Sequence, residues 1–131
     1  MNRRAFGCAG ETLAAAYLEK KGYVITARNV YIGGGEIDLI AETDKDLVFV
    51  EVKTRTEGRS IACYGPPAAA VNAKKKRILM QAAQRYLYEH PTDKQPRIDV
   101  MEVYVTPRAY TVGVMNAGSR IVHYENAVRK S

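Results

Sequence analysis

Two strand-like segments joined by a short polar turn constrain the fold of this chain more than any other part of its sequence. Residues 36–42 read EIDLIAE, residues 47–54 read LVFVEVKT, and the polar residues Thr43-Asp44-Lys45-Asp46 lie between them. A loop of this length between two such segments is typical of an antiparallel β-hairpin. The hairpin is therefore the starting point for any fold of this chain.

The expected register of the hairpin brings charged residues together on one face. A symmetric turn would place Asp38 opposite Glu51 and Glu36 opposite Lys53. Side chains directly opposed on one face of such a pair have Cβ atoms about 5 Å apart. Strand alternation gives the other face only apolar side chains, which must be buried. They are Ile37, Leu39, Ala41, Val48, Val50 and Val52.

The face that carries the acids is apolar at its turn end, where Ile40 and Phe49 lie. We therefore expect Asp38 and Glu51 at the rim of a packed surface, where two carboxylates held so close must share a proton or a cation. Carboxylate oxygens suit a hard cation such as Mg²⁺ or Mn²⁺. Lys53 follows on the same face and could hold a phosphate or stabilise a transition state. The competing interpretation is a surface hairpin with cross-strand salt bridges.

The remaining segments are expected to complete a single α/β domain over residues 1–131, with a mixed central β-sheet flanked by α-helices. Pro66-Pro67 predicts a loop over residues 56–70, beside the hairpin. We expect helices near residues 9–21 and 72–88, strands near 23–29 and 98–105, and two shorter strands near 110–114 and 121–124.

Composition limits the functional classes that this chain can belong to. The formal net charge of +6 favours a polyanionic partner such as nucleic acid. No stretch approaches the roughly 20 apolar residues of a membrane span, and Glu11 and Thr12 interrupt the apolar start as they would not in a signal peptide. The two cysteines form no paired motif, which argues against structural zinc. A cytoplasmic protein with reduced thiols is the expectation.

Basic residues indicate where a nucleic acid could bind. Four consecutive cations open the second long helix, where the helix dipole disfavours them, so their presence favours phosphate contacts over a merely solubilising helix start. They are Lys74, Lys75, Lys76 and Arg77. Arg55 and Arg59 come directly after the hairpin, in a loop beside the acids, and could also contact backbone phosphates.

Three other polar residues are expected to have mainly structural roles. Glu36 would orient Lys53 through a salt bridge, although a further metal ligand is the alternative. Asp99 would pair with Arg97 or another nearby cation, and His123 would be a partly exposed histidine of a strand.

The hairpin residues resemble a known pattern. Asp38, with Glu51-Val52-Lys53 on the next strand, is similar to the PD-(D/E)xK nuclease signature, although Ile37 stands where the name has proline. GETLAAAYLEKKGY, GEIDLIAE, LVFVEVKTR and RIDVMEVYV, in this order, resemble the YraN family of predicted endonucleases, and the arrangement is similar to archaeal Holliday-junction resolvases. Gln84 and Tyr88 match a Gln-x-x-x-Tyr spacing of some related nucleases at a level close to chance.

This resemblance implies a restriction-endonuclease-like core and a metal-dependent endonuclease that hydrolyses phosphodiester bonds in DNA, including branched or structured DNA. Glu11 would join Asp38 and Glu51 as a ligand of Mg²⁺ or Mn²⁺, directly or through water, and Lys53 would be the catalytic lysine. Without the resemblance, Glu11 would be taken as a residue that favours the helix dipole. Analogy with the resolvases adds the expectation of a homodimer.

Two other functions stay open on the sequence. One is a non-catalytic nucleic-acid-binding module that retains the nuclease fold, and the other is a protein-interaction adaptor whose basic charge is incidental. The presence of all the motif residues ranks the enzyme first, because a degenerate copy is free to lose any of them. The sequence leaves open the shape of the substrate, DNA against RNA, and one metal ion against two.

Overall fold

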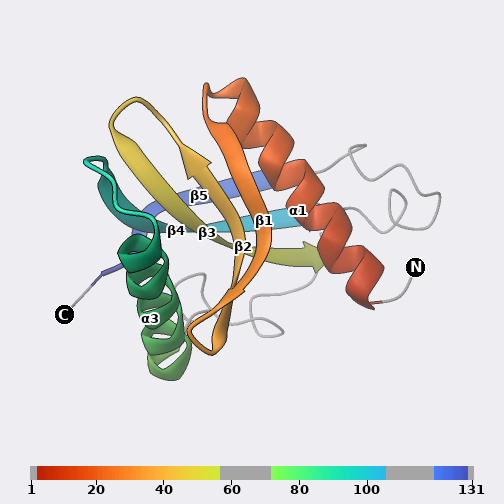
Figure 1. Cartoon of the computed structure of the whole chain (residues 1–131). Coiled ribbons are helices and arrows are strands. Elements are labelled where there is room, and N and C mark those ends of the chain that lie inside the picture. The colour runs from red at the N-terminus through yellow and green to blue at the C-terminus, as the bar shows by residue number, and fades with distance from the viewer. Residues whose placement is uncertain (1–2, 57–71, 106–119, 130–131) are drawn as a thin grey trace.

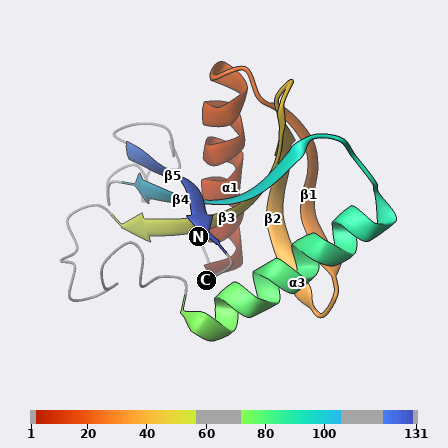
Figure 2. The same ribbon diagram turned by 90° about the vertical axis from the view of Figure 1, so that its left-hand side faces the viewer.

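The computed structural model describes residues 3–56, 72–105 and 120–129, which form a five-stranded β-sheet with a helix on each face (Figure 1). In chain order the elements are α1 (Arg3–Lys20), β1 (Val24–Ile32), β2 (Gly35–Glu42), β3 (Asp46–Thr56), α3 (Ala73–Glu89), β4 (Gln95–Val105) and β5 (Arg120–Val128). Figure 2 shows α3 crossing the sheet near the turn between β1 and β2, away from α1.

The sheet is mixed, as the sequence predicted. Its strand order is β1-β2-β3-β4-β5, and β3 and β4 are parallel while the other neighbours are antiparallel. The parallel pair needs a crossover connection, and α3 lies within it. The fold is therefore an α/β fold consistent with a restriction-endonuclease-like core.

Both faces of the sheet are buried, and strand β3 contributes to both. Val48, Val50 and Val52 pack in the cluster that contains Leu18 of α1. Phe49 packs in the other cluster, with residues of α3. The predicted apolar face of the hairpin is thus confirmed on β3, and the acid-bearing face is also covered near the turn because α3 lies over it.

The hairpin register is as predicted wherever β2 and β3 pair, but the pairing ends before Asp38 and Glu51, which were expected to lie opposite each other. Leu39 pairs with Val50 and Ile40 pairs with Phe49, but the paired residues of β2 and β3 end there. Ile37 packs in the same cluster as Ile40, three residues away, and not in the cluster that holds Leu39. The prediction that Ile37 shares a face with Leu39 was wrong, because strict alternation fails around the intervening Asp38.

The elements begin and end close to the predicted positions. The largest difference is at the start of α1, which begins at Arg3, six residues before the expected start at residue 9. Gly22, with a φ of 94°, follows the end of this helix, as expected of a helix stop. The predicted strand near 110–114 and most of the 56–70 loop lie outside the described residues. No helix in the described ranges is both long and apolar enough to cross a membrane.

Candidate active site

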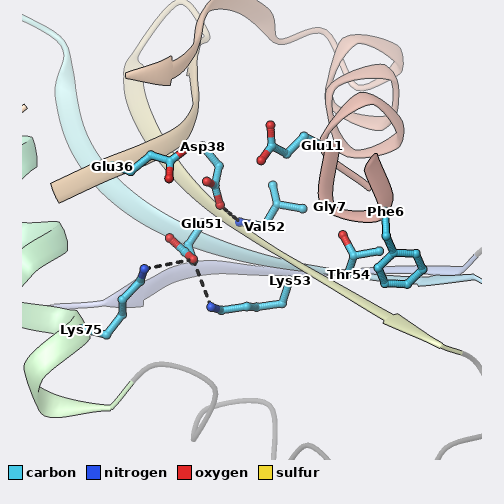
Figure 3. Close-up of a pocket in the computed structure, with 10 residues that line it drawn as sticks. All are labelled: Phe6, Gly7, Glu11, Glu36, Asp38, Glu51, Val52, Lys53, Thr54 and Lys75. Carbon is cyan, nitrogen blue, oxygen red and sulfur yellow. Dashed lines mark hydrogen bonds and ion pairs between the residues drawn. The ribbon is translucent and has the colours of Figure 1, made fainter. Parts of the chain in front are cut away.

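A cavity of about 910 Å³ opens where α1, β2, β3 and the start of α3 meet (Figure 3). Most of its polar lining consists of acids and lysines. The lining residues are Phe6, Gly7, Glu11, Glu36, Asp38, Glu51, Val52, Lys53, Thr54 and Lys75. The cavity thus contains Asp38, Glu51, Lys53 and Glu11, the four residues that the sequence nominated as catalytic.

Asp38 occupies the point at which β2 and β3 stop pairing. Its Oδ2 accepts a hydrogen bond of 2.8 Å from the backbone N–H of Val52. Burial, followed by the negative charge of Glu51, raises the pKa of Asp38 to about 7, against the opposing effect of the Val52 hydrogen bond. The carboxylate is therefore partly protonated near neutral pH unless a cation lies beside it.

Glu51 is buried on β3 and is shared by two lysines. Its Oε1 lies 3.2 Å from Nζ of Lys53 and 3.6 Å from Nζ of Lys75, which reaches the cavity from the first turn of α3. Its Oε2 is buried and accepts no hydrogen bond from any described residue. The expected partner of Lys53 was Glu36, and the structure places Glu51 beside its ammonium group instead.

Glu11 reaches the cavity because α1 lies very close to β3 at this point. A Cβ atom at Gly10 would overlap the side chain of Thr54, so a larger residue there would push the helix away. Burial raises the pKa of Glu11, and the Arg28 guanidinium and a hydrogen bond from the Asn29 side chain act in the opposite direction. Arg28 lies 3.8 Å from Glu11 Oε1, too far for a hydrogen bond, and that buried oxygen has no hydrogen-bond partner.

Asn29 is a residue of this site that the sequence analysis missed. It lies on β1 between the pairs Arg28–Leu39 and Val30–Ile37, across from Asp38, and its φ is 52°. Asparagine tolerates this left-handed conformation better than most residues, and such outliers often lie at functional sites. The only signal in the sequence was an asparagine within an otherwise strand-like run, and a turn residue would look the same.

The donor set could accept a hard cation, although it is not closed around one. Among the described residues, no three acidic, histidine or cysteine side chains converge closely enough to form a complete metal site. Two buried oxygens without hydrogen-bond partners, Glu11 Oε1 and Glu51 Oε2, nevertheless belong to acids of the cavity. Mg²⁺ needs only one or two protein carboxylates, because it keeps several waters. An incomplete carboxylate set of this kind fits such an ion.

The predicted phosphate-binding residues are divided by the structure. Lys75 lines the cavity, whereas Lys74, Lys76 and Arg77 are exposed on the first turns of α3. Arg55 lies 3.9 Å from the buried Glu102, and its side chain is 15% exposed. Arg59 lies outside the described residues.

A second polar cluster holds β4 and β5 together, away from the cavity. Asp99 is fully buried and accepts hydrogen bonds from Arg97, from His123 Nε2 at 2.7 Å and from the backbone N–H of Asn126. Burial alone would raise the pKa of Asp99, but these hydrogen bonds lower it overall. The predicted pairing with Arg97 is confirmed. His123 is a partly exposed residue of β5, as expected, although its side chain alone is only 3% exposed.

The Gln-x-x-x-Tyr spacing has no counterpart in the cavity. Gln84 and Tyr88 are both exposed on α3, and the ring of Tyr88 is not covered by the sheet. The buried residues of this helix are Leu79, Ala82 and Ala83. The pair therefore lies on the solvent side of α3.

Comparison with known proteins relates most of the chain to a single protein family. The model of the family described as "Uncharacterised protein family UPF0102" matches residues 10–103, a range that includes all the acids and lysines of the cavity. A UPF0102 protein of Caldanaerobacter subterraneus subsp. tengcongensis is 41% identical over 117 residues, covering 88% of this chain and 93% of the relative.

Two further relatives have similar coverage. A UPF0102 protein of Symbiobacterium thermophilum is 49% identical over 108 residues, covering 82% of this chain and 87% of the relative. A UPF0102 protein of Carboxydothermus hydrogenoformans is 38% identical over 129 residues, covering 98% of each chain. The likeness thus extends over nearly the whole length of these proteins.

Proposed function

The chain belongs to the UPF0102 family, and from this premise we propose that it is a Mg²⁺- or Mn²⁺-dependent endonuclease acting on phosphodiester bonds in DNA, including branched or structured DNA. The observation that carries the proposal is the common cavity of Glu11, Asp38, Glu51, Lys53 and Lys75. Acids able to hold a divalent cation, beside lysines able to hold a phosphate, are the groups that phosphodiester hydrolysis requires.

Asp38 and Glu51 would hold the metal ion, and Glu11 would contribute directly or through water. The buried oxygens of Glu11 and Glu51 that lack hydrogen bonds support this assignment, as does the raised pKa of Asp38. Buried carboxylates that lie close together destabilise a protein unless a cation or a proton offsets their repulsion. When bound, the ion would polarise the phosphate and activate a water molecule.

The two lysines would bind the phosphate. Lys53 and Lys75 both contact one oxygen of Glu51. Either ammonium group could therefore turn toward a phosphate in the cavity while the other lysine stays paired with the Glu51 carboxylate. Lys53 would position the attacking water or offset the charge that builds on the phosphate in the transition state. Lys75 comes from α3, so it would approach the phosphate from a different direction.

The remaining basic residues would hold the DNA backbone. The net charge of +6 favours a polyanion, and Lys74, Lys76 and Arg77 are exposed on the first turns of α3, the helix that brings Lys75 to the cavity. Arg55 and Arg59 complete the proposed phosphate contacts. A cytoplasmic location and a homodimer that acts on DNA are part of the same proposal.

A second function is favoured by one observation. Because no three potential ligands among the described residues form a complete metal site, the cavity could bind nucleic acid without cleaving it. A non-catalytic module of this kind would bind DNA equally well with or without a divalent metal ion, and its binding would not depend on Asp38.

The test compares cleavage by the wild-type protein, Asp38→Asn and Glu51→Gln on junction, flap and linear DNA, and on RNA of the same sequence. We expect cleavage that requires Mg²⁺ or Mn²⁺ and falls by about 100-fold or more in both variants. Asp44→Asn, in the exposed turn of the hairpin, removes one acid outside the cavity and should leave the rate unchanged. Equal cleavage by all four proteins would contradict the proposal, and metal-independent binding without cleavage would favour the non-catalytic module.

A further inference from the structure

A second cavity of about 520 Å³ adjoins the candidate active site. The two cavities share Gly7, Glu11 and Glu36, so they lie on either side of these residues. The second one extends toward β1 and the start of α1, where Asn29, Tyr31 and Arg4 line it. None of the groups proposed for the reaction, apart from Glu11, lines this second space.

Tyr31 presents an uncovered aromatic ring at this cavity. Its exposed fraction is 75%, and it pairs with Glu36 across β1 and β2. β1 is an edge strand, so no further strand of the described sheet lies beside it on its outer side. An open aromatic face beside a polyanion site is the usual platform on which a nucleobase stacks, because every base has a π face.

The charges of the cavity select a base over a phosphate or an apolar peptide. Glu11 and Glu36 form one wall and would repel a phosphate there, but their oxygens can accept hydrogen bonds from the amino groups of a base. Arg4, exposed on α1 at the same cavity, can hold the phosphate that follows. An apolar peptide segment would find acids, an arginine and an asparagine around it.

We propose that this second cavity is a subsite for one unpaired nucleobase, stacked on Tyr31, next to the bond that the candidate active site cleaves. The inference rests on the proposed function and deepens it, because it names the class of substrate. A base within a duplex has both faces covered by its neighbours and cannot stack on a protein ring unless it is extruded. The preferred substrate is therefore a nucleic acid with an unpaired nucleotide at the cleavage site, such as a flap, a gap or a branch point.

The experiment measures binding, so that it does not depend on cleavage. The full-length chain carries Asp38→Asn throughout, and fluorescence anisotropy with Mg²⁺ present compares a flapped DNA with a blunt duplex of the same length. We expect Tyr31→Ala and Tyr31→Leu to weaken binding of the flapped DNA by about tenfold and to leave duplex binding unchanged. Tyr31→Phe keeps the ring and should bind like the parent.

Two controls separate stacking from a general surface effect. Tyr88→Ala removes a tyrosine that is 80% exposed on the solvent side of α3, so it should not alter the binding of either DNA. A single abasic position moved along the unpaired arm should weaken binding of the parent at one position. The same lesion should have no further effect on Tyr31→Ala, because the contact is already lost.

The outcomes distinguish this inference from the proposed function. Cleavage by the wild type together with unchanged flap binding by Tyr31→Ala would overturn the subsite and leave the nuclease proposal intact. A tenfold loss on Tyr31→Ala in a protein that never cleaves would support the subsite and contradict the nuclease proposal. Equal losses on flap and duplex, no binding by the parent, or no abasic position that weakens binding would each overturn the subsite.

Discussion

The Asp38 carboxylate accepts a hydrogen bond from the Val52 amide where β2 and β3 separate, at a distance of 2.8 Å. The two strands are paired up to Leu39 and Val50, so the carboxylate satisfies an amide at the end of the ladder. This bond fixes the orientation of Asp38 beside Glu51, and it ties an acid proposed to bind metal to the stability of the sheet.

The Val52 contact predicts that two substitutions of Asp38 differ in stability. Asp38→Ala leaves the Val52 amide without an acceptor at a buried site and should lower the free energy of unfolding by about 1–3 kcal/mol. Asp38→Asn keeps an oxygen acceptor and removes a buried charge, so at pH 8 without metal it should be at least as stable as the wild type. Urea unfolding monitored by circular dichroism checks this, and equal stability of the two variants would contradict it.

The raised pKa of Asp38 predicts a decline in stability as pH rises. A carboxyl with a pKa near 3.8 in the unfolded chain and about 7 in the folded protein stabilises the fold below pH 4, and this contribution is lost between pH 4 and 7. The slope from this group is at most about 1.4 kcal/mol per pH unit. Urea unfolding in EDTA across this range should show the decline in the wild type, with a smaller decline in Asp38→Asn.

Saturating Mg²⁺ or Mn²⁺ provides the control for that measurement. A cation that binds the folded protein stabilises it and displaces the proton from Asp38, so the decline should vanish when metal is present. A wild-type protein whose stability is flat from pH 4 to 7 without metal would show that Asp38 titrates normally.

The sequence was sufficient to predict the hairpin and the elements that pack with it, but not the detailed geometry of the candidate active site. Alternation along β3 and the polar turn set the register as far as Leu39 and Val50, because local geometry determines both. The break at Asp38 coincides with the left-handed backbone of Asn29 on the neighbouring strand, and no pattern in β2 encodes it. Similarly, Lys75 differs from Lys74 and Lys76 only because of the rotation of α3 about its axis, which packing against the sheet decides.

The conformation of Asn29 predicts an order of stability among its variants. A φ of 52° costs an ordinary residue about 1–2 kcal/mol, so Asn29→Ala should destabilise the fold by about that amount. Asn29→Gly should be less harmful, because glycine adopts this conformation freely. Thermal unfolding of the three proteins checks the order, and an alanine variant more stable than the glycine variant would contradict it.

The position of Lys75 predicts that it differs from its neighbour Lys74 in cleavage. Both lysines add one charge to the surface proposed to face DNA, but of the two only Lys75 lies beside Glu51. Lys75→Ala should lower the rate of cleavage at saturating DNA by about tenfold or more, whereas Lys74→Ala should weaken binding slightly and leave that rate unchanged. Single-turnover kinetics separates the two effects, and equal rates for both variants would remove Lys75 from the proposed site.

The Asp99 cluster predicts a pH dependence of opposite sign to that of Asp38. The pKa of Asp99 is lowered in the folded protein. The contribution of Asp99 to stability is therefore present above about pH 4, and it is lost as the pH falls through the pKa that Asp99 has in the folded protein. Asp99→Asn should lower the free energy of unfolding at pH 7 by about 3 kcal/mol, because Arg97 and His123 lose their shared carboxylate. The Asp99→Asn substitution should also flatten the acid side of the plot of stability against pH.

The Asp99 cluster lies away from the cavity, so the substitution should not change metal binding. Calorimetric titration with Mn²⁺, at a temperature where the variant stays folded, should give the wild-type affinity. If Asp99→Asn lowered both the metal affinity and the stability, the Asp99 cluster and the candidate active site would be coupled through the sheet.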